Sequence, residues 1–188
     1  MEDVLRSLEE KILSSYKLNS LTKAFERISD RYRKGSGTFL QTQEERWVYL
    51  LTRLPATFAT SVRVCQELRA RRSDLTFQSL LDVGAGPGAG LWAASQVFDT
   101  LTKATLIERD VDFLRIGKEI ASFSSLDAVK QAIWKCEDMS RLGDIESHDL
   151  TILSYSIGEV RSILGRYFYQ SFGRLLKKLL LLSNLVLL

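Results

Sequence analysis

A glycine-rich turn follows a short apolar run in the segment LLDVGAGPGAG, residues 80–90. Gly84, Gly86 and Gly88 lack a Cβ atom, so a ligand can approach the backbone closely and the chain can adopt positive φ. The helix expected next presents unpaired N–H groups at its start, which suit a phosphate or a carboxylate. No Gly-Lys-Ser/Thr follows, which excludes a P-loop, but Gly84, Gly86 and Ala89 satisfy the looser dinucleotide pattern. The turn therefore predicts a ligand site without naming the ligand.

Three acidic residues stand at the ends of three successive expected strands. Asp82 lies two residues before the first glycine, where its carboxylate can meet a ligand ammonium group directly or through water. Glu108 ends the next strand, and a carboxylate there can accept hydrogen bonds from both ribose hydroxyls. Asp138 follows the third strand and can accept a hydrogen bond from an adenine amino group, while the N–H of Met139 reaches a ring nitrogen.

An amino-acid head, a ribose and an adenine together describe S-adenosylmethionine. The alternative for each acid is an ordinary structural role, with Asp82 as a turn or helix cap and Glu108 and Asp138 as solvated loop residues. A Rossmann domain for a nicotinamide dinucleotide is the weaker rival for the whole set. The predicted cofactor-binding residues are Asp82, Gly84, Gly86, Gly88, Glu108, Asp138 and Met139.

The segment SYSIGE, residues 154–159, follows the fourth expected strand, where methyl-acceptor chemistry is placed in related folds. Enzymes that methylate nucleic-acid amines commonly carry Asn/Asp-Pro-Pro-aromatic there, and this segment has neither the proline pair nor a cysteine nucleophile. Tyr155 and Glu159 can contact an acceptor or act as a base. Packing and capping of the next helix is the favoured interpretation of both. No catalytic residue is assigned.

Strands alternate with helices from residue 77 onward, which predicts an α/β fold with a parallel sheet. The expected strands are 79–83, 103–110, 131–139 and 149–159, and the expected helices are 88–98, 111–122 and 160–172. Ligands of such sheets bind outside the carboxyl ends of the strands. The glycine turn and the three acids fall at that edge. His148, in a polar turn before the fourth strand, is expected on the surface.

The first 75 residues are expected to be helical and basic. Apolar residues recur at helical spacing through two helices in the first thirty residues, a third helix covers 43–54, and Pro55 opens a fourth. This region carries 14 Lys and Arg against 10 Asp and Glu. The arginines singled out as RNA-binding candidates are Arg31, Arg33, Arg69, Arg71 and Arg72. A solvated helical surface explains the charge equally well.

Composition excludes several classes of protein. Cys65 and Cys136 are the only cysteines, and neither forms a Cys-x-x-Cys pair, so no disulfide framework or metal site is expected and both are predicted to be buried. The N-terminus has no signal-type apolar run, and the apolar tail is shorter than the ~20 residues that span a bilayer. We expect a cytoplasmic protein without membrane contact. Its oligomeric state is left open.

Four segments together resemble one family: DRYRKG, RLPATFAT, LLDVGAGPGAGLWAA and SYSIGE. From Leu21 to Glu159 the chain is similar to the bacterial and mitochondrial methyltransferase-like proteins of the small ribosomal subunit, relatives of methyltransferase-like protein seventeen. The resemblance implies helices beside an S-adenosylmethionine-binding sheet, a 16S rRNA partner, and a role in subunit assembly or rRNA methylation. Mitochondrial members hold a C-terminal iron–sulfur cluster, which we do not expect in this chain.

The tail departs from the family's pattern. Such sheets run 3-2-1-4-5-7-6, and family members continue into a fifth strand ending Ile-Glu-Pro-Gly-Thr-Pro, whereas this chain ends LLLLSNLVLL. One permitted set of codons for residues 183–188 reads Glu-Pro-Gly-Thr-Pro from its third base. We therefore hypothesise that residues 175–188 are out-of-frame sequence. The sheet is then incomplete at its C-terminal side, and the tail either adds beside the fourth strand or coats the exposed face.

These patterns predict three regions: a helical region at 1–75, a Rossmann-like domain of the class I methyltransferase type at 76–174, and an apolar tail at 175–188. The predicted function is S-adenosylmethionine-dependent methylation or assembly of the small ribosomal subunit. One alternative is a non-catalytic RNA-binding assembly factor, for which the missing proline motif and the basic helices argue. The other is a small-molecule methyltransferase, which would not need the five arginines.

Overall fold

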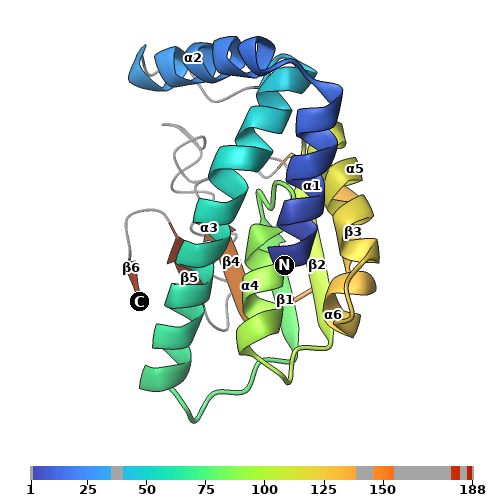
Figure 1. The fold of residues 1–188 in the computed structure, drawn as a ribbon. Coiled ribbons are helices and arrows are strands. Elements are labelled where there is room, and N and C mark those ends of the chain that lie inside the picture. Colours follow the sequence, from blue (N-terminus) through green and yellow to red (C-terminus); the bar gives the residue numbers. More distant parts are fainter. Residues whose placement is uncertain (1, 35–39, 139–145, 155–178, 183–185, 188) are drawn as a thin grey trace. The chain divides into compact units, whose positions relative to one another are not determined.

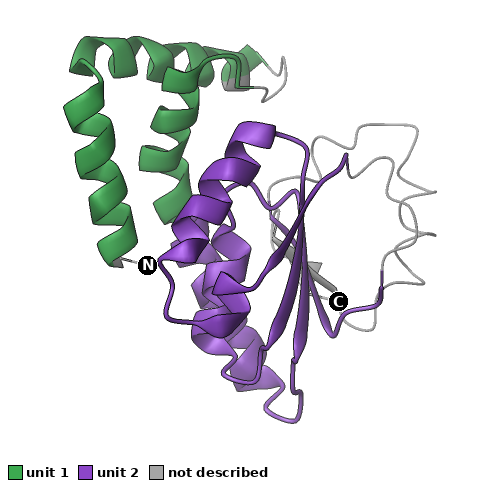
Figure 2. Ribbon diagram, turned by 90° about the vertical axis from the view of Figure 1, so that its right-hand side faces the viewer, with its two compact units in different colours: residues 1–56 green, residues 57–188 purple. Residues whose placement is uncertain are grey.

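The computed structural model describes residues 2–34, 40–138, 146–154, 179–182 and 186–187 (Figure 1). The chain divides into two compact units, Met1–Ala56 and Thr57–Leu188, which are drawn in different colours in Figure 2. Each unit is described by itself. The boundaries at residues 75 and 174 that the sequence suggests stay predictions.

The first unit consists of helices. Helix α1 covers Glu2–Ser15, α2 covers Leu18–Lys34, and the unit ends within α3, which covers Gln43–Arg71. Apolar side chains on one face of each helix form its core, as helical spacing predicts. The buried residues of this core are Leu8, Ile12, Leu21, Ala24, Ile28, Val48, Leu50 and Leu54.

Helix α3 is one element where two were expected. Pro55 lies inside it, and the boundary between the two units falls one residue later, after Ala56. A proline removes one N–H from the helical ladder, so the carbonyl of Leu51 loses its partner four residues on. The fixed φ of proline is still a helical value. The helix therefore continues through Pro55, and the prediction of a helix start there was wrong.

The second unit is built on a sheet with the strand order β3-β2-β1-β4-β5-β6. The parallel strands β1 to β4 are Ser79–Val83, Lys103–Glu108, Ile133–Cys136 and Leu150–Ser154. The helices α4, α5 and α6 are Ala89–Val97, Val111–Ser122 and Asp127–Lys130. In Figure 2 the helices of this unit lie on one side of its strands. This arrangement confirms the predicted class I methyltransferase sheet and its 3-2-1-4 order.

The tail contributes two strands beside β4. Strand β5, Leu179–Leu182, is parallel to β4, and β6, Val186–Leu187, is antiparallel to β5. Of the two arrangements expected for the tail, this is the one that adds beside the fourth strand. The pairing covers N–H and C=O groups of β4 that an edge strand would leave open. The helix expected at 160–172 lies outside the described residues.

Two polar residues lie where the sequence did not place them. His148 is 3% exposed, not on the surface: its Nε2 is 3.1 Å from Thr105 Oγ1 and its Nδ1 is 2.6 Å from the carbonyl oxygen of Glu146. Both ring nitrogens have partners, which makes burial tolerable. Burial also lowers the pKa of His148. Cys65 is buried as expected, but Cys136 is exposed at the end of the short strand β3.

Candidate cofactor site

The glycine turn is anchored to strand β2 by its own backbone. The N–H groups of Gly84 and Ala85 both donate to the carbonyl of Ile107, at 2.9 and 3.0 Å. Gly84, Gly86 and Gly88 all have positive φ, at 67°, 54° and 92°. L-residues with a side chain rarely adopt these values. The turn therefore needs its glycines for the backbone path itself, in addition to any ligand.

Gly86 marks the open side of the turn. Among the residues that the structure describes, a Cβ atom built on Gly86 meets no atom within 4 Å. Its N–H donates to Glu108 Oε2 at 2.7 Å, which ties the middle of the turn to the end of β2. The turn is thus fixed in place, and although Gly86 itself is buried, no atom of the described residues fills the space that a side chain there would take. This is the geometry in which a ligand can lie against the backbone.

Gly88 is crowded where Gly86 is open. A Cβ atom on Gly88 would stand 2.9 Å from Cη2 of Trp134 and 3.5 Å from Cδ2 of Leu106. Gly88 is also the N-cap of helix α4, and no side chain caps that helix. In the structure the missing Cβ of Gly88 makes room for the Trp134 ring. The uncapped helix start leaves N–H groups for a polar ligand.

Glu108 joins the glycine turn to the start of helix α5. Its Oε1 accepts a hydrogen bond from the N–H of Asp110 at 2.8 Å, while Oε2 holds Gly86. Burial and the charge of Asp110 raise the pKa of Glu108, the N–H donors of Asp110, Gly86 and Arg109 lower it, and the net result is a raised pKa. Each carboxylate oxygen has a second lone pair. The half-buried carboxylate can therefore accept further hydrogen bonds from a ligand at the open side of the turn.

Asp82 is buried beneath the first turn of α4. Its side chain is 1% exposed, and neither carboxylate oxygen has a hydrogen-bond partner among the described residues. A Cβ atom on Gly90 would stand 2.6 Å from Asp82 Oδ2, so the carboxylate faces the helix backbone. Burial raises the pKa of Asp82 to about 7, with a contribution from the charge of Glu108, although the nearby Leu91 N–H lowers it.

The thiol of Cys65 on α3 lies in the same buried region. Burial, together with the charge of Asp82, raises the pKa of Cys65 to about 12. A thiol with that pKa is protonated at neutral pH and unreactive. Cys65 therefore has the structural role that the sequence predicts for it.

The remaining predicted residues lie at the same edge of the sheet or outside the described part. Glu108 and Cys136 are partners in the β2–β3 pairing, and Asp138 follows two residues after the end of β3. Asp138 is partly buried. Met139, Tyr155 and Glu159 lie outside the described residues. Two acids, Asp82 and Glu108, are thus brought to the glycine turn itself.

The family assignment comes from the sequence around this site. A family model described as mitochondrial small ribosomal subunit Rsm22 matches residues 43–169. The chain belongs to the Rsm22 family. The matched residues include the glycine turn and every predicted cofactor residue, while α1 and α2 precede them. None of the curated proteins matches the chain in sequence.

Solved structures similar to this Rsm22-family chain share its fold. The glycopeptide N-methyltransferase MtfA, complexed with S-adenosyl-L-methionine, is 18% identical with a TM-score of 0.53, and the match covers 64% of this chain and 53% of MtfA. A candidate S-adenosyl-L-methionine-dependent methyltransferase from Methanococcus maripaludis is 14% identical with a TM-score of 0.57, covering 77% and 67%. DesVI of Streptomyces venezuelae is 16% identical with a TM-score of 0.54, covering 76% and 58%. The chain spans about half the length of MtfA, and these likenesses establish the fold.

The two predicted RNA-binding arginines of the first unit have different surroundings. Arg31 on α2 forms an ion pair with Glu45, whose side chain is 1% exposed, and its Nη1 lies 3.1 Å from Glu45 Oε1. Arg33 is exposed and pairs with Asp30 at 2.8 Å. Burial raises the pKa of Glu45, but hydrogen bonds from Arg31, the Gln41 N–H and Arg27 outweigh it and leave the pKa lowered. Arg31 therefore helps to neutralise a buried carboxylate.

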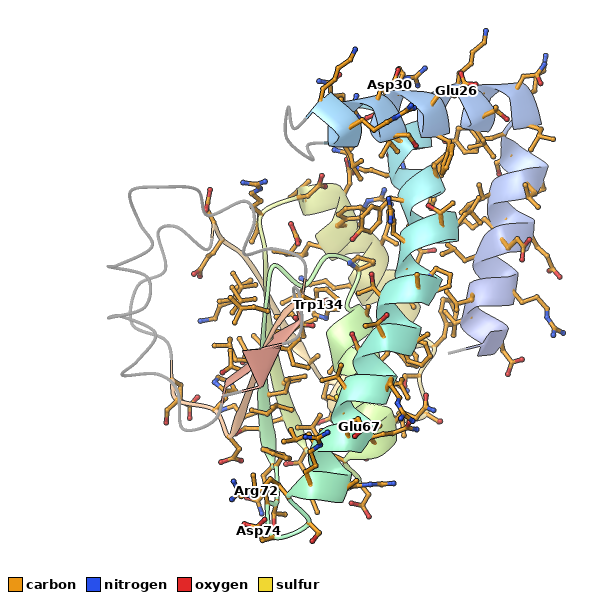
Figure 3. All side chains as sticks on the ribbon, turned by 90° about the vertical axis from the view of Figure 1, so that its left-hand side faces the viewer. Glu26, Asp30, Glu67, Arg72, Asp74 and Trp134 are labelled. Carbon is orange, nitrogen blue, oxygen red and sulfur yellow. The ribbon has the colours of Figure 1, made fainter. Side chains whose placement is uncertain are left out.

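The three predicted arginines of the second unit also have protein partners. Arg69 donates to the last carbonyl of α4 at 2.9 Å, so it closes the C-terminal end of that helix. Arg71 lies 3.6 Å from Glu67, and Arg72 lies 2.8 Å from Asp74 at the end of α3 (Figure 3). Exposed ion pairs of this kind contribute about 0–1 kcal/mol each. A phosphate can therefore compete for Arg71 and Arg72 more readily than for Arg69.

Trp134 and Gly117 are residues that the sequence patterns did not single out. Gly117 lies inside helix α5, and a Cβ atom on it would stand 2.3 Å from Cη2 of Trp134. A glycine within a helical pattern signals a close approach by another group. That signal was present in the segment VDFLRIGKEIAS at 111–122.

Among the described residues, no group of three His, Cys, Asp or Glu side chains can hold a metal ion, and no helix has the length and apolar character needed to cross a bilayer.

Proposed function

We propose that this Rsm22-family chain binds S-adenosylmethionine at the glycine turn and acts in the cytoplasm on the small ribosomal subunit, in methylation of 16S rRNA or in assembly. The observation that carries the cofactor proposal is the open side of the turn at Gly86, next to the half-buried carboxylate of Glu108. The family supports the link to the small subunit. The fold neighbour MtfA was crystallised with the same cofactor.

The residues at the turn fit the parts of S-adenosylmethionine. Glu108 is placed to accept hydrogen bonds from the ribose hydroxyls through its free lone pairs. The uncapped start of α4 offers N–H donors to the cofactor's carboxylate. The buried carboxylate of Asp82 lies beneath that helix start and, when ionised, favours the ammonium group of the same amino-acid head.

The cofactor would supply an already activated methyl group on its sulfonium. The protein's contribution is then orientation, which can lower a barrier by several kcal/mol, up to about 7–11. The backbone bonds from Gly84 and Ala85 to Ile107 hold the turn rigid for that purpose. Tyr155 comes directly after β4 in the sequence and Glu159 four residues later, and both remain the candidates for contact with the methyl acceptor.

A second function is favoured by one observation in the sequence. The segment SYSIGE after β4 has no Asn/Asp-Pro-Pro-aromatic motif, which argues for an assembly factor that binds the cofactor and RNA without methyl transfer. The small-molecule alternative has no comparable support. Methyl incorporation into 16S rRNA from a labelled donor distinguishes the two ribosomal functions.

The cofactor proposal is tested by calorimetric titration of the chain with S-adenosylmethionine. We expect saturable binding by the wild type and at least a tenfold weaker affinity for Glu108→Ala, about the loss of one charged hydrogen-bonding group. Glu137→Ala is the matched control, because Glu137 is exposed and, like Glu108, lies at the carboxyl end of a strand of the same sheet. Absence of binding by the wild type, or an equal loss in both variants, would refute the proposal.

The RNA proposal needs a separate measurement. Binding of 16S RNA should weaken steeply as salt concentration rises, because each phosphate contact releases counterions. A salt-independent affinity, or equal binding of an unrelated acidic polymer, would contradict a specific RNA role.

A further inference from the structure

The indole of Trp134 is held between the glycine turn and helix α5. Trp134 lies in β3 and is labelled in Figure 3. Its Cη2 atom stands 2.9 Å from the position of a Cβ on Gly88 and 2.3 Å from that of a Cβ on Gly117. One ring atom thus occupies space that a Cβ on either of two separate elements would need, which only glycine leaves free.

The same ring lies on the face of the sheet that the helices cover, between α5 and the glycine turn. Leu106, the β2 partner of Trp134 in the strand pairing, also reaches Gly88, with Cδ2 at 3.5 Å from a Cβ there. The carbonyl oxygen of Pro87 stands 3.2 Å from a Cβ on Gly117. The turn, α5 and two strands therefore meet at the tip of the indole.

The glycine at position 117 makes helix α5 less stable than an alanine there would. A glycine in a helix interior costs roughly 1 kcal/mol relative to alanine. Gly117 is buried in the middle of the twelve-residue helix α5, and it is neither an N-cap nor a C-cap. The close approach of Trp134 accounts for a glycine at this position. A smaller ring or an aliphatic side chain at 134 would remove the two closest contacts of a Cβ at 117 and leave only the Pro87 carbonyl oxygen at 3.2 Å.

The indole lies against the same glycine turn at which we propose that the cofactor binds. Gly88 is two residues from Gly86, and Gly86 is bonded to Glu108. A shift of the indole moves Gly88 directly and changes the distance between Gly86 and the Glu108 carboxylate. Trp134 is itself only partly buried, so filling the core does not account for all of its contacts.

We propose that Trp134 is a positioning residue for the cofactor: its ring tip sets the height of the turn at Gly86–Gly88 above the sheet, and Gly117 allows the ring to do so. This inference rests on the proposed S-adenosylmethionine site. Trp134 acts through the turn and is not assigned a contact with the reacting methyl group.

The test is a double-mutant cycle between positions 117 and 134. Gly117→Ala places a Cβ where the ring tip lies, so we expect the affinity for S-adenosylmethionine to fall about tenfold. Trp134→Phe withdraws the ring tip and should weaken binding by a smaller factor, about threefold to fivefold. In the double variant the methyl group added at position 117 meets no ring tip and only the Pro87 carbonyl oxygen at 3.2 Å, so the affinity should lie much closer to that of Trp134→Phe alone than to the product of the two separate losses. Lys118→Ala, on the exposed side of the same helix, is the control that should leave affinity unchanged.

A second readout does not depend on the ligand. The amide proton of Gly86 is protected by its bond to Glu108, so hydrogen exchange of that amide should speed up in Gly117→Ala and return in the double variant to the rate of Trp134→Phe. If the wild type fails to bind the cofactor, the proposed function is wrong, and the exchange rates alone decide whether Trp134 sets the turn. Multiplicative losses of affinity in the double variant, or Gly86 exchange that stays the same in all four proteins, would overturn the inference.

Discussion

Glu108 accepts the N–H of Gly86 at 2.7 Å, so the last residue of β2 holds the middle of the turn that follows β1. Its other carboxylate oxygen accepts the N–H of Asp110, which in turn caps helix α5 by accepting the N–H groups of Asp112 and Phe113. One acidic side chain therefore fixes both the glycine turn and the start of the next helix. A ligand bound at the turn would meet a site whose shape is already set.

Glu108→Gln tests whether the carboxylate supports the turn before any ligand binds. The amide keeps one oxygen acceptor but has a donor in place of the other, so one of the two N–H groups loses its partner. We expect a loss of about 1–3 kcal/mol in the free energy of unfolding. Urea unfolding measures the loss, with Glu137→Gln as the exposed control, which should stay within roughly 0.5 kcal/mol of the wild type, the usual range for a surface substitution. Equal stabilities of all three proteins would show that the two hydrogen bonds do not support the turn.

Gly86→Ala tests whether the space beside Gly86 is occupied by the ligand, because the described residues do not fill that space. The new methyl group meets no atom of the described part of the chain within 4 Å, so the expected cost is the strain of an alanine at φ 54°, about 1–2 kcal/mol. It fills the space that the proposed cofactor needs, and affinity for S-adenosylmethionine should fall by more than the strain alone explains, about a hundredfold. Calorimetry measures the affinity for S-adenosylmethionine, and a thermal melt of the same samples measures the loss of stability. Unchanged affinity with normal folding would place the ligand elsewhere.

Asp82→Asn should make stability less dependent on pH. The pKa of Asp82 is about 7 in the folded protein and 3.8 when unperturbed. Between these values the folded state keeps a proton that the unfolded state releases, so the free energy of unfolding falls as pH rises from about 4 to 7. The asparagine variant has no such loss. Its stability advantage over the wild type should therefore grow between pH 5 and pH 8, by about 2–3 kcal/mol. Urea unfolding at the two pH values measures this difference, and parallel pH profiles would argue that the carboxylate is solvated.

The buried imidazole of His148 should act with the opposite sign. Its pKa is lowered by burial, so below the unperturbed value of 6.5 the unfolded state takes up a proton that the folded state refuses. The contribution of His148 to stability should therefore fall as pH drops below 6.5, so the wild type should lose stability relative to His148→Gln, whatever the other groups contribute to both proteins. Thermal melts between about pH 7 and pH 5 detect the difference. A variant whose melting temperature follows the wild type throughout that range would mean that His148 does not cause the acid sensitivity.

The local patterns of the sequence were enough to predict the parallel strands and their ligand edge. A run such as SLLDV is apolar on both faces and ends in glycines, so its strand, its burial and the turn follow from nearest neighbours in the sequence. The prediction of a helix start at Pro55 was wrong because it relied on the proline alone, whereas the residues on both sides of it belong to one helix of 29 residues. Helix continuity depends on the whole element, and the proline costs it a single hydrogen bond.

Contacts between distant residues were beyond those patterns. Trp134 was read only as a strand residue, because nothing near it in the sequence shows that Gly88 and Gly117 converge on its ring. His148 was placed on the surface because it sits in a polar turn, and its partner Thr105 lies 43 residues away on another strand. Asp82 was correctly placed at the strand end. That its carboxylate faces the backbone of α4 depends on the packing of that helix.

Arg31 and Arg33 form a matched pair for testing which arginines are available to RNA. Arg31 neutralises Glu45, so Arg31→Ala leaves a buried carboxylate with weaker compensation, and we expect a loss of about 2–3 kcal/mol in the free energy of unfolding. Arg33 is exposed beside Asp30, and Arg33→Ala should change stability by less than about 0.5 kcal/mol while weakening 16S RNA binding and reducing its salt slope by about one. Chemical unfolding and filter binding at several salt concentrations test the two expectations on the same proteins. A stable Arg31→Ala variant that loses RNA affinity would reverse the assignment and make Arg31 an RNA contact.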